Sequence, residues 1–251
     1  MEVRGMSFEI WLKQMLGETG EPERRMRAEL AHRALMPRPA NERPAPDPNT
    51  AEPKPPDYSK PDSAASDSAA PSATASGPTA EANALRRSAV LIPLVPSGTG
   101  FRAVLTLRPP HIRHGGQLSF PGGLLHEGES PQQAALRETH EEIGTPQALY
   151  SIIGPLTTLH MAHTGTLVTP FVGFLRSRPR FRPEPGEVEQ IVEVPLEPMC
   201  DPSSVRRQRQ SLRGVDYEIP CWNVHPEVPL WGATAMILSE LLDWYRGFRG
   251  G

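Results

Sequence analysis

The stretch Gly123–Thr145, GLLHEGESPQQAALRETHEEIGT, contains the start and stop signals of one well-bounded helix. Ser130 can cap the free amides, Pro131 suits the first helical position, and Gln133 completes a capping box. Gly144, with a proline two residues later, marks the end of the helix. The sequence therefore predicts a helix between these two signals.

Three carboxylates, those of Glu138, Glu141 and Glu142, fall on one face of this helix at offsets of three and four. Such neighbours repel each other by a few tenths of a kcal/mol per pair. A hard divalent cation would remove that repulsion, and Arg137 could hold the array by pairing with Glu129 or Glu141. A solvated acidic face is the common alternative, but the glycine-rich entry loop and the spacing favour a metal site.

The spacing resembles the Nudix box. The glycine, glutamate and arginine positions of that pattern are occupied by Gly123, Glu129, Arg137, Glu138, Glu141, Glu142 and Gly144. Thr139 and Thr145 stand where an aliphatic residue is usual. The resemblance implies an α/β/α sandwich around a mixed sheet and a Mg²⁺- or Mn²⁺-dependent hydrolase. It also implies metal binding by Glu138, Glu142, then Glu141 and the Gly123 carbonyl, with Arg137 and Glu129 as supporting residues.

The segment just before the helix, RPPHIRHGGQLSFPGG at 108–123, is basic and carries four glycines. Glycine lets backbone amides approach a ligand closely, and the amino end of a helix favours negative charge, so this loop could cradle phosphates. The lysine of a P-loop is missing, which disfavours that class of NTPase.

The same segment carries a second resemblance, to the coenzyme A diphosphatase branch of the Nudix hydrolases. It includes Leu105–Arg108 and Ile112–Gly123, with further echoes at Val168–Gly173, Glu187–Leu196 and Leu230–Leu238. The branch implies hydrolysis of coenzyme A, or its acyl or oxidised derivatives, to 3′,5′-ADP and 4′-phosphopantetheine or its acyl form. It implies substrate binding by Arg108, Arg113, His114, Gln117, Ser119 and Phe120.

The general base stays open between a glutamate of the helix, Glu142 or Glu141, and an acid from outside the box, for which Glu187 is the candidate. Two alternative functions also stay open. One is a Nudix diphosphatase acting on ADP-ribose, NADH or an oxidised nucleotide. The other is a non-catalytic module that senses a nucleotide, which the complete set of metal glutamates disfavours.

Composition restricts the partners and the compartment. A net charge of −3 over 251 residues argues against nucleic acid and anionic membranes as general partners. No apolar run approaches the ~20 residues that span a bilayer, and the start resembles neither a secretory signal nor a transit peptide. Cys200 and Cys221 form no recognisable disulfide framework. We therefore expect a cytoplasmic protein with a small-molecule substrate, and a homodimer is possible.

Three regions are predicted along the chain. Residues 1–36 hold two short helices, and the apolar stripe from Phe8 to Leu16 should pack on the main domain or on a second subunit. Residues 37–83, rich in Pro, Ala and Ser, should be a disordered linker. Residues 84–251 should form the Nudix domain.

Within this last region we expect a hairpin of two strands, further strands, and a buried helix at the end of the chain. Pro93 should place the first strand at an edge or bulge. The final stretch of the predicted sheet is either a strand or a short helix. The strand ranges are 88–95 and 101–108 for the hairpin, then 150–159, 166–175 and 187–196.

Two further groups of residues are candidate sites. The pairs His111/His114 and His160/His163 have a zinc-compatible spacing, but solvated or phosphate-contacting histidines are the more common outcome. The arginines at 206, 207, 209 and 213 suit a solvated loop more than a contact with a coenzyme phosphate.

Overall fold

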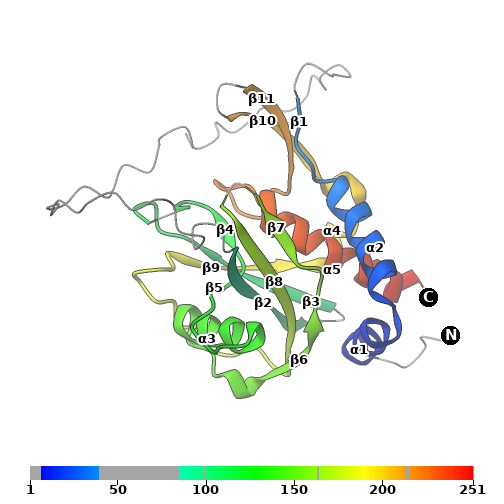
Figure 1. Ribbon diagram of the computed structural model, residues 1–251, viewed down its shortest axis with the longest axis vertical. Coiled ribbons are helices and arrows are strands. Elements are labelled where there is room, and N and C mark those ends of the chain that lie inside the picture. Colours follow the sequence, from blue (N-terminus) through cyan, green and yellow to red (C-terminus); the bar gives the residue numbers. More distant parts are fainter. Residues whose placement is uncertain are drawn as a thin grey trace, which may run out of the picture.

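The computed structural model of the chain describes residues 7–39, 85–98, 100–112, 114–162, 164–212 and 215–250 (Figure 1). The predictions that concern 40–83, Arg113, His163 and Arg213 lie outside these residues. Where the predicted linker is described, at Arg38–Pro39, it forms β1, which pairs with β11. Backbone pairing at an open sheet edge needs no apolar side chain, which is why composition missed it.

Among the described residues, eight strands form one mixed sheet with the central order β4-β3-β2-β8-β6. β2 is parallel to β8 and antiparallel to β3, while β5, β7 and β9 pair with β2, β8 and β3 respectively. The strands are β2 Arg86–Ser97, β3 Gly100–Leu107, β4 Leu118–Ser119, β5 Gly122–Leu124, β6 Tyr150–Pro155, β7 Leu159–Met161, β8 Thr166–Leu175 and β9 Gln190–Pro195.

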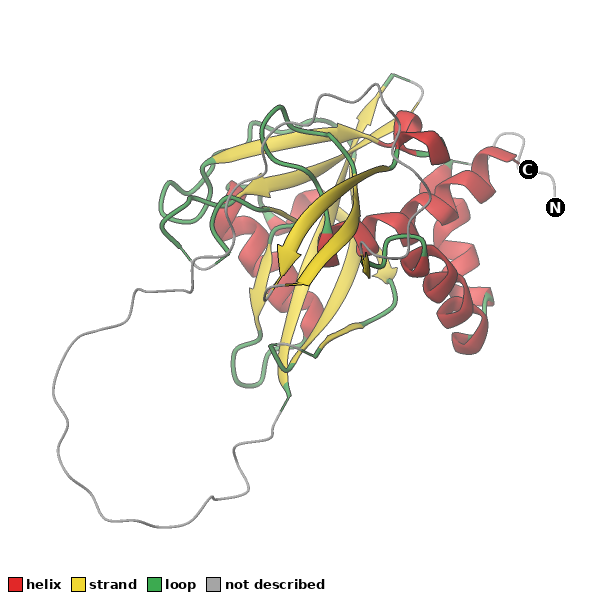
Figure 2. Cartoon of the chain, turned by 90° about the horizontal axis from the view of Figure 1, so that it is seen from above, coloured by secondary structure: helices red, strands yellow, loops and turns green. Residues whose placement is uncertain are grey.

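Helices cover both faces of this sheet, as Figure 2 shows with helices on either side of the strands. α3 (Pro131–Ile143) buries its apolar residues in one core cluster with Leu91 and Phe171. α1 (Phe8–Glu18) and α5 (Gly232–Gly250) bury theirs in the cluster on the other face. The predicted α/β/α sandwich is therefore confirmed.

The predicted hairpin is confirmed as β2 and β3, but the edge position expected from Pro93 is wrong, because β2 lies between β3 and β8. On the side of β2 away from β8, pairing runs from Ser88 to Val90 with β5 and from Leu94 to Ser97 with β3. Pro93 lies in the gap between these two ladders. Its missing N–H therefore removes no ladder hydrogen bond on that side.

The first predicted helix is confirmed, and its apolar stripe packs on the main domain. Phe8 is 1% exposed, and its ring meets the ring of Tyr245 in α5 edge-on at 4.8 Å. Trp11 packs edge-on against Trp244. α2 (Glu21–Arg33) lies along α5, where Arg27 Nε donates to Asp243 Oδ2 at 3.0 Å. α1 thus belongs to the core of the main domain, although the residues of that domain come much later in the sequence.

The second half of the chain contains a hairpin that the sequence analysis missed. β10 (Arg206–Leu212) and β11 (Val215–Cys221) pair throughout and form a three-stranded sheet with β1. The prediction of a solvated loop for the arginine run is therefore wrong, because the backbone forms a strand. The side chains of Arg206, Arg207 and Arg209 are nevertheless exposed. The ambiguous stretch at 187–196 is a strand, β9, followed by the single turn α4 (Leu196–Met199).

Two 3-10 turns complete the described elements, at Gln147–Leu149 and Pro202–Ser204. Within the described part of the chain, every helix is too short or too polar to cross a membrane.

Candidate active site

The helix α3 has the ends that its sequence predicts. Ser130 accepts a hydrogen bond from the Gln133 backbone, and the Gln133 side chain accepts one from the Ser130 backbone at 2.9 Å. Gly144 ends the helix in the left-handed region at φ 69°. On the buried side, Thr139 donates its hydroxyl to the Ala135 carbonyl at 2.6 Å. This back-bond satisfies the polar atom of a residue that replaces the usual aliphatic one.

Three glutamates converge at one end of this helix. Glu138 and Glu142 from α3 and Glu187 from the loop before β9 each bring one carboxylate oxygen to within 4.8 Å of the other two. Glu142 is 2% exposed, and burial raises its pKa to about 8. Burial also raises the pKa of Glu138. Burial therefore disfavours the ionised form of these carboxylates, and a bound cation would favour it.

A divalent cation fits these residues on two observations. Glu142 Oε2 is buried and has no hydrogen-bond partner among the described residues, so a ligand oxygen is available. The Glu138 carboxylate lies over Gly123, where an added Cβ would come within 2.4 Å of its Cδ. Carboxylate and carbonyl oxygens are the donors that Mg²⁺ and Mn²⁺ prefer.

Arg137 organises the carboxylates around the cluster. Its Nε donates to Glu129 Oε1 at 2.9 Å, and its Nη1 donates to Glu138 Oε1 at 2.8 Å and Glu141 Oε2 at 2.9 Å. The Arg137 guanidinium, together with the His126 amide, holds the pKa of Glu129 at about 2. The Glu141 side chain is 53% exposed and lies outside the group of three, paired with Arg137.

Glu187 reaches the site because its loop is tied to the end of α3. The Glu184 amide donates to the Glu142 carbonyl at 2.9 Å, and the Glu187 and Val188 amides both donate to the Glu184 carbonyl. The Glu189 amide then donates to the Leu107 carbonyl at the end of β3, at 2.8 Å. These bonds fold the loop back over the helix and bring a carboxylate 45 positions away in sequence next to Glu142.

The predicted substrate residues lie unequally around this cluster. Arg108 Nη1 is 3.9 Å from Glu142 Oε1, and the Arg108 amide donates to the Gln117 carbonyl at 3.1 Å. Ser119 lies on β4, with its hydroxyl 3.2 Å from that of Thr106. His114 is exposed and has a left-handed backbone, φ 56°.

Phe120 is the exception in the predicted set, because it is 3% exposed and belongs to the core cluster that contains α5. Its ring is held by packing and offers no face to a ligand. Among the described residues, His111, His114 and His160 take no part in a group of three side chains that could hold a metal ion, so that part of the chain gives no support to the zinc alternative.

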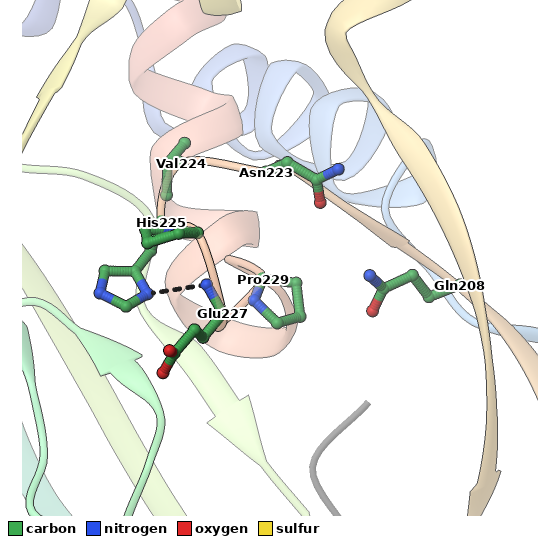
Figure 3. Close-up of a pocket in the computed structure, with 7 residues that line it drawn as sticks. Gln208, Asn223, Val224, His225, Glu227 and Pro229 are labelled. Carbon is green, nitrogen blue, oxygen red and sulfur yellow. Dashed lines mark hydrogen bonds between the residues drawn. The ribbon is translucent and has the colours of Figure 1, made fainter. Parts of the chain in front are cut away.

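A separate cavity of about 310 Å³ lies between β10 and the loop at 223–229. In Figure 3, the Gln208 side chain extends from β10 towards Pro229, and Asn223 lines the upper rim. His225, in the same loop, contacts Gln190 Oε1 through Nε2 at 3.1 Å. Gln190 pairs with Leu107 at the end of β3, next to Arg108, so His225 links the rim of the cavity to this strand end. No sequence motif marked this cavity.

The family model of the NUDIX domain matches residues 85–215. The chain belongs to the Nudix family. Its relatives include the uncharacterized Nudix hydrolase NudL of Photorhabdus laumondii, 35% identical over 160 residues that cover 62% of this chain and 83% of the relative. The mitochondrial Nudix hydrolase 15 of Arabidopsis thaliana is 33% identical over 161 residues, 61% of this chain and 56% of that one.

Solved Nudix structures are more distant. The Ap4A hydrolase of C. elegans in a binary complex is 22% identical, with a TM-score of 0.40, and the match covers 45% of this chain and 82% of that one. Membership of the Nudix family accounts for the glutamate helix and its divalent cation.

Proposed function

We propose that this Nudix chain hydrolyses the diphosphate bond of coenzyme A, or of its acyl or oxidised derivatives, to 3′,5′-ADP and 4′-phosphopantetheine or its acyl form. One observation carries the proposal. The segment 108–123, which resembles the coenzyme A branch, adjoins the glutamate cluster, with Arg108 Nη1 at 3.9 Å from Glu142 Oε1. Specificity residues and catalytic residues would thus act on one ligand.

The proposed roles follow from charge and position. Glu138, Glu142 and the Gly123 carbonyl would hold Mg²⁺ or Mn²⁺, with Glu141 as a further ligand if it exchanges its bond to Arg137. A bound divalent cation neutralises diphosphate charge and lowers the pKa of an attacking water. Glu187 is exposed at the edge of the cluster, where it could accept the proton of that water.

The remaining proposed contacts concern the substrate itself. The Arg108 guanidinium would pair with a phosphate as the substrate displaces its weak contact with Glu142. Gln117, Ser119, His114 and Arg113 would position the coenzyme. Phe120 would support them only through packing, because its ring is buried.

The cavity beside Gln208 supports a substrate with a long neutral arm. Its lining consists mainly of amide, proline and valine side chains, with one carboxylate, that of Glu227. Such a lining suits amide and methylene groups better than a further phosphate. Because the cavity adjoins Gln190 and the end of β3, an arm leaving the diphosphate could reach it.

We also propose that residues 84–251 form the Nudix domain and 37–83 a linker, with the two helices of 1–36 docked onto the domain.

Cys200 and Cys221 are both free thiols, which fits a reducing compartment such as the cytoplasm.

The deciding experiment is product analysis with purified full-length protein and coenzyme A, ADP-ribose or NADH, each with and without Mg²⁺ or Mn²⁺. We expect metal-dependent release of 3′,5′-ADP from coenzyme A, faster than cleavage of the other two. Faster cleavage of ADP-ribose or NADH would overturn the substrate while keeping the diphosphatase chemistry. Binding of a nucleotide without any turnover would overturn the enzyme and support a sensor.

A further inference from the structure

The helix α2 has an exposed apolar stripe that the domain does not use. Met26 is 56% exposed and Leu30 is 63% exposed. The buried residues of α2, Ala28 and His32, lie on the opposite side of the helix. The exposed stripe therefore points away from α5, towards the outside of the molecule, where α2 lies in Figure 1.

A charged residue stands at each end of this stripe. Glu23 precedes Met26 by three positions, and Arg33 follows Leu30 by three, so all four residues share one face, which we call the α2 stripe. Both charged residues are exposed, and neither has an ion pair or a side-chain hydrogen bond within the described residues. The α2 stripe thus carries an acid, two apolar side chains and a base, in that order.

This order is complementary to itself. When two such helices lie antiparallel around a two-fold axis at the level of Ala28, Met26 of one copy faces Leu30 of the other. In the same register, Glu23 of one copy faces Arg33 of the other. One register therefore satisfies the apolar and the ionic contacts together, and the symmetry makes each contact twice.

We propose that the α2 stripe is the interface of a symmetric homodimer, with a second copy of this chain as its partner. A lipid surface fits less well. Two apolar side chains offer little area for insertion among acyl chains, and the charges of Glu23 and Arg33 in the stripe cancel, so anionic headgroups gain no net attraction from it. The proposal does not depend on the substrate and gives the amino-terminal helices a function besides packing.

The interface is small, and this sets what an experiment should find. A single pair of helices buries less surface than the roughly 1,200 Å² of standard stable complexes. The dimer should accordingly dissociate on dilution. Sedimentation of the full-length protein over a wide concentration series should show a reversible shift between the mass of one chain and twice that mass.

Charge reversal tests the register directly. Glu23→Arg leaves only arginines at both ends of the stripe, and Arg33→Glu leaves only glutamates, so each variant should dimerise at least tenfold more weakly than the unchanged protein. A mixture of the two single variants restores both ion pairs between unlike copies and should form a heterodimer. The double variant, with both substitutions in one chain, should again form a homodimer.

The controls separate this interface from misfolding and from other partners. Circular dichroism and thermal unfolding should show that each variant is folded. Recovery of the dimer by the double variant should show that neither substitution prevents dimerisation by itself. A protein that stays monomeric at all concentrations would overturn the proposal. So would a dimer that is indifferent to both charge reversals, or one that forms only on anionic vesicles.

Discussion

A carboxylate oxygen of Glu187 lies within 4.8 Å of one of Glu142, although one residue comes from a loop and the other from the helix α3. The loop is held by the hydrogen bond from the Glu184 amide to the Glu142 carbonyl. The backbone of Glu142 therefore helps to position Glu187, whose carboxylate lies close to the Glu142 carboxylate. This pairing adds a carboxylate from outside the Nudix box to the group of side chains that could hold a metal ion.

The first prediction distinguishes Glu142 from its neighbour Glu141. Glu142→Gln should lower metal-dependent hydrolysis by about 100-fold or more, because a ligand of the cation contributes several kcal/mol to the transition state. It should also remove the rise in thermal midpoint that Mg²⁺ or Mn²⁺ gives the unchanged protein. Glu141→Gln is the matched control and should have a smaller effect on both measurements, because its side chain is 53% exposed and paired with Arg137.

Equal losses in the two variants would place Glu141 among the essential ligands. Full activity of Glu142→Gln would remove Glu142 from the site.

The second prediction concerns the close approach of Gly123 and Glu138. In Gly123→Ala, the new Cβ would lie 2.4 Å from Glu138 Cδ, so the carboxylate must move away. We expect metal affinity, measured by titration calorimetry, to fall by about 10- to 100-fold. Gly17→Ala, in an open part of α1, is the control and should raise stability by about 0.5–1 kcal/mol without affecting metal binding. Unchanged metal affinity in Gly123→Ala would contradict the close packing of the Glu138 carboxylate against Gly123.

The third prediction is a dependence of stability on pH. The pKa of Glu129 in the folded protein is about 2, compared with an ordinary value of 4.5. The pairing of its carboxylate with Arg137 therefore stabilises the fold fully above pH 4.5, and the effect is lost as the pH falls from 4.5 towards 2. Glu129→Gln should lower the thermal midpoint near neutral pH, and the gap from the unchanged protein should shrink in acid.

This gap is measured by thermal unfolding in metal-free buffers across the acid range. Glu127→Gln, two positions earlier and exposed, should show no such gap at any pH. A gap for Glu129→Gln that stays constant with pH would show that the loss does not come from the charge of Glu129.

The fourth prediction tests the cavity beside β10. Gln208→Leu removes an amide from the lining and should raise KM for coenzyme A about 2- to 10-fold with kcat unchanged, as expected for one lost hydrogen bond. KM for ADP-ribose, which lacks the long arm, should not change. Gln210→Leu, two positions along the same strand but outside the lining, is the control. Equal effects on both substrates would exclude the cavity as the site of the arm.

The fifth prediction asks whether α1 is part of the domain core. Phe8→Ala should lower the free energy of unfolding by about 3–5 kcal/mol, because the ring is 1% exposed and packs against Tyr245. Ile10→Ala, on the same helix but 59% exposed, should change it by about 0.5 kcal/mol or less. Denaturant unfolding gives both values. Equal and small changes would mean that α1 is dispensable, and that residues 84–251 fold without it.

The helix of the candidate site could be predicted almost completely from local sequence. Ser130, Gln133 and Gly144 fix its ends through bonds that span at most four residues, so the signals survive without tertiary information. The hairpin of β2 and β3 was predictable for the same reason. The edge position predicted from Pro93 was wrong, because the effect of a missing N–H depends on which strands flank the proline. The gap between the β5 and β3 ladders is a tertiary feature.

The sequence by itself determined the Nudix box, the helix α3 and the type of side chain that faces a cation, since helical periodicity alone places Glu138 and Glu142 on one face. Only the tertiary structure decided which further carboxylate joins them and that Phe120 is buried. The physical reason is distance along the chain. Contacts within one helix follow from its fixed geometry, whereas the approach of Glu187 depends on hydrogen bonds between α3, β3 and a loop that meet only after the sheet has formed.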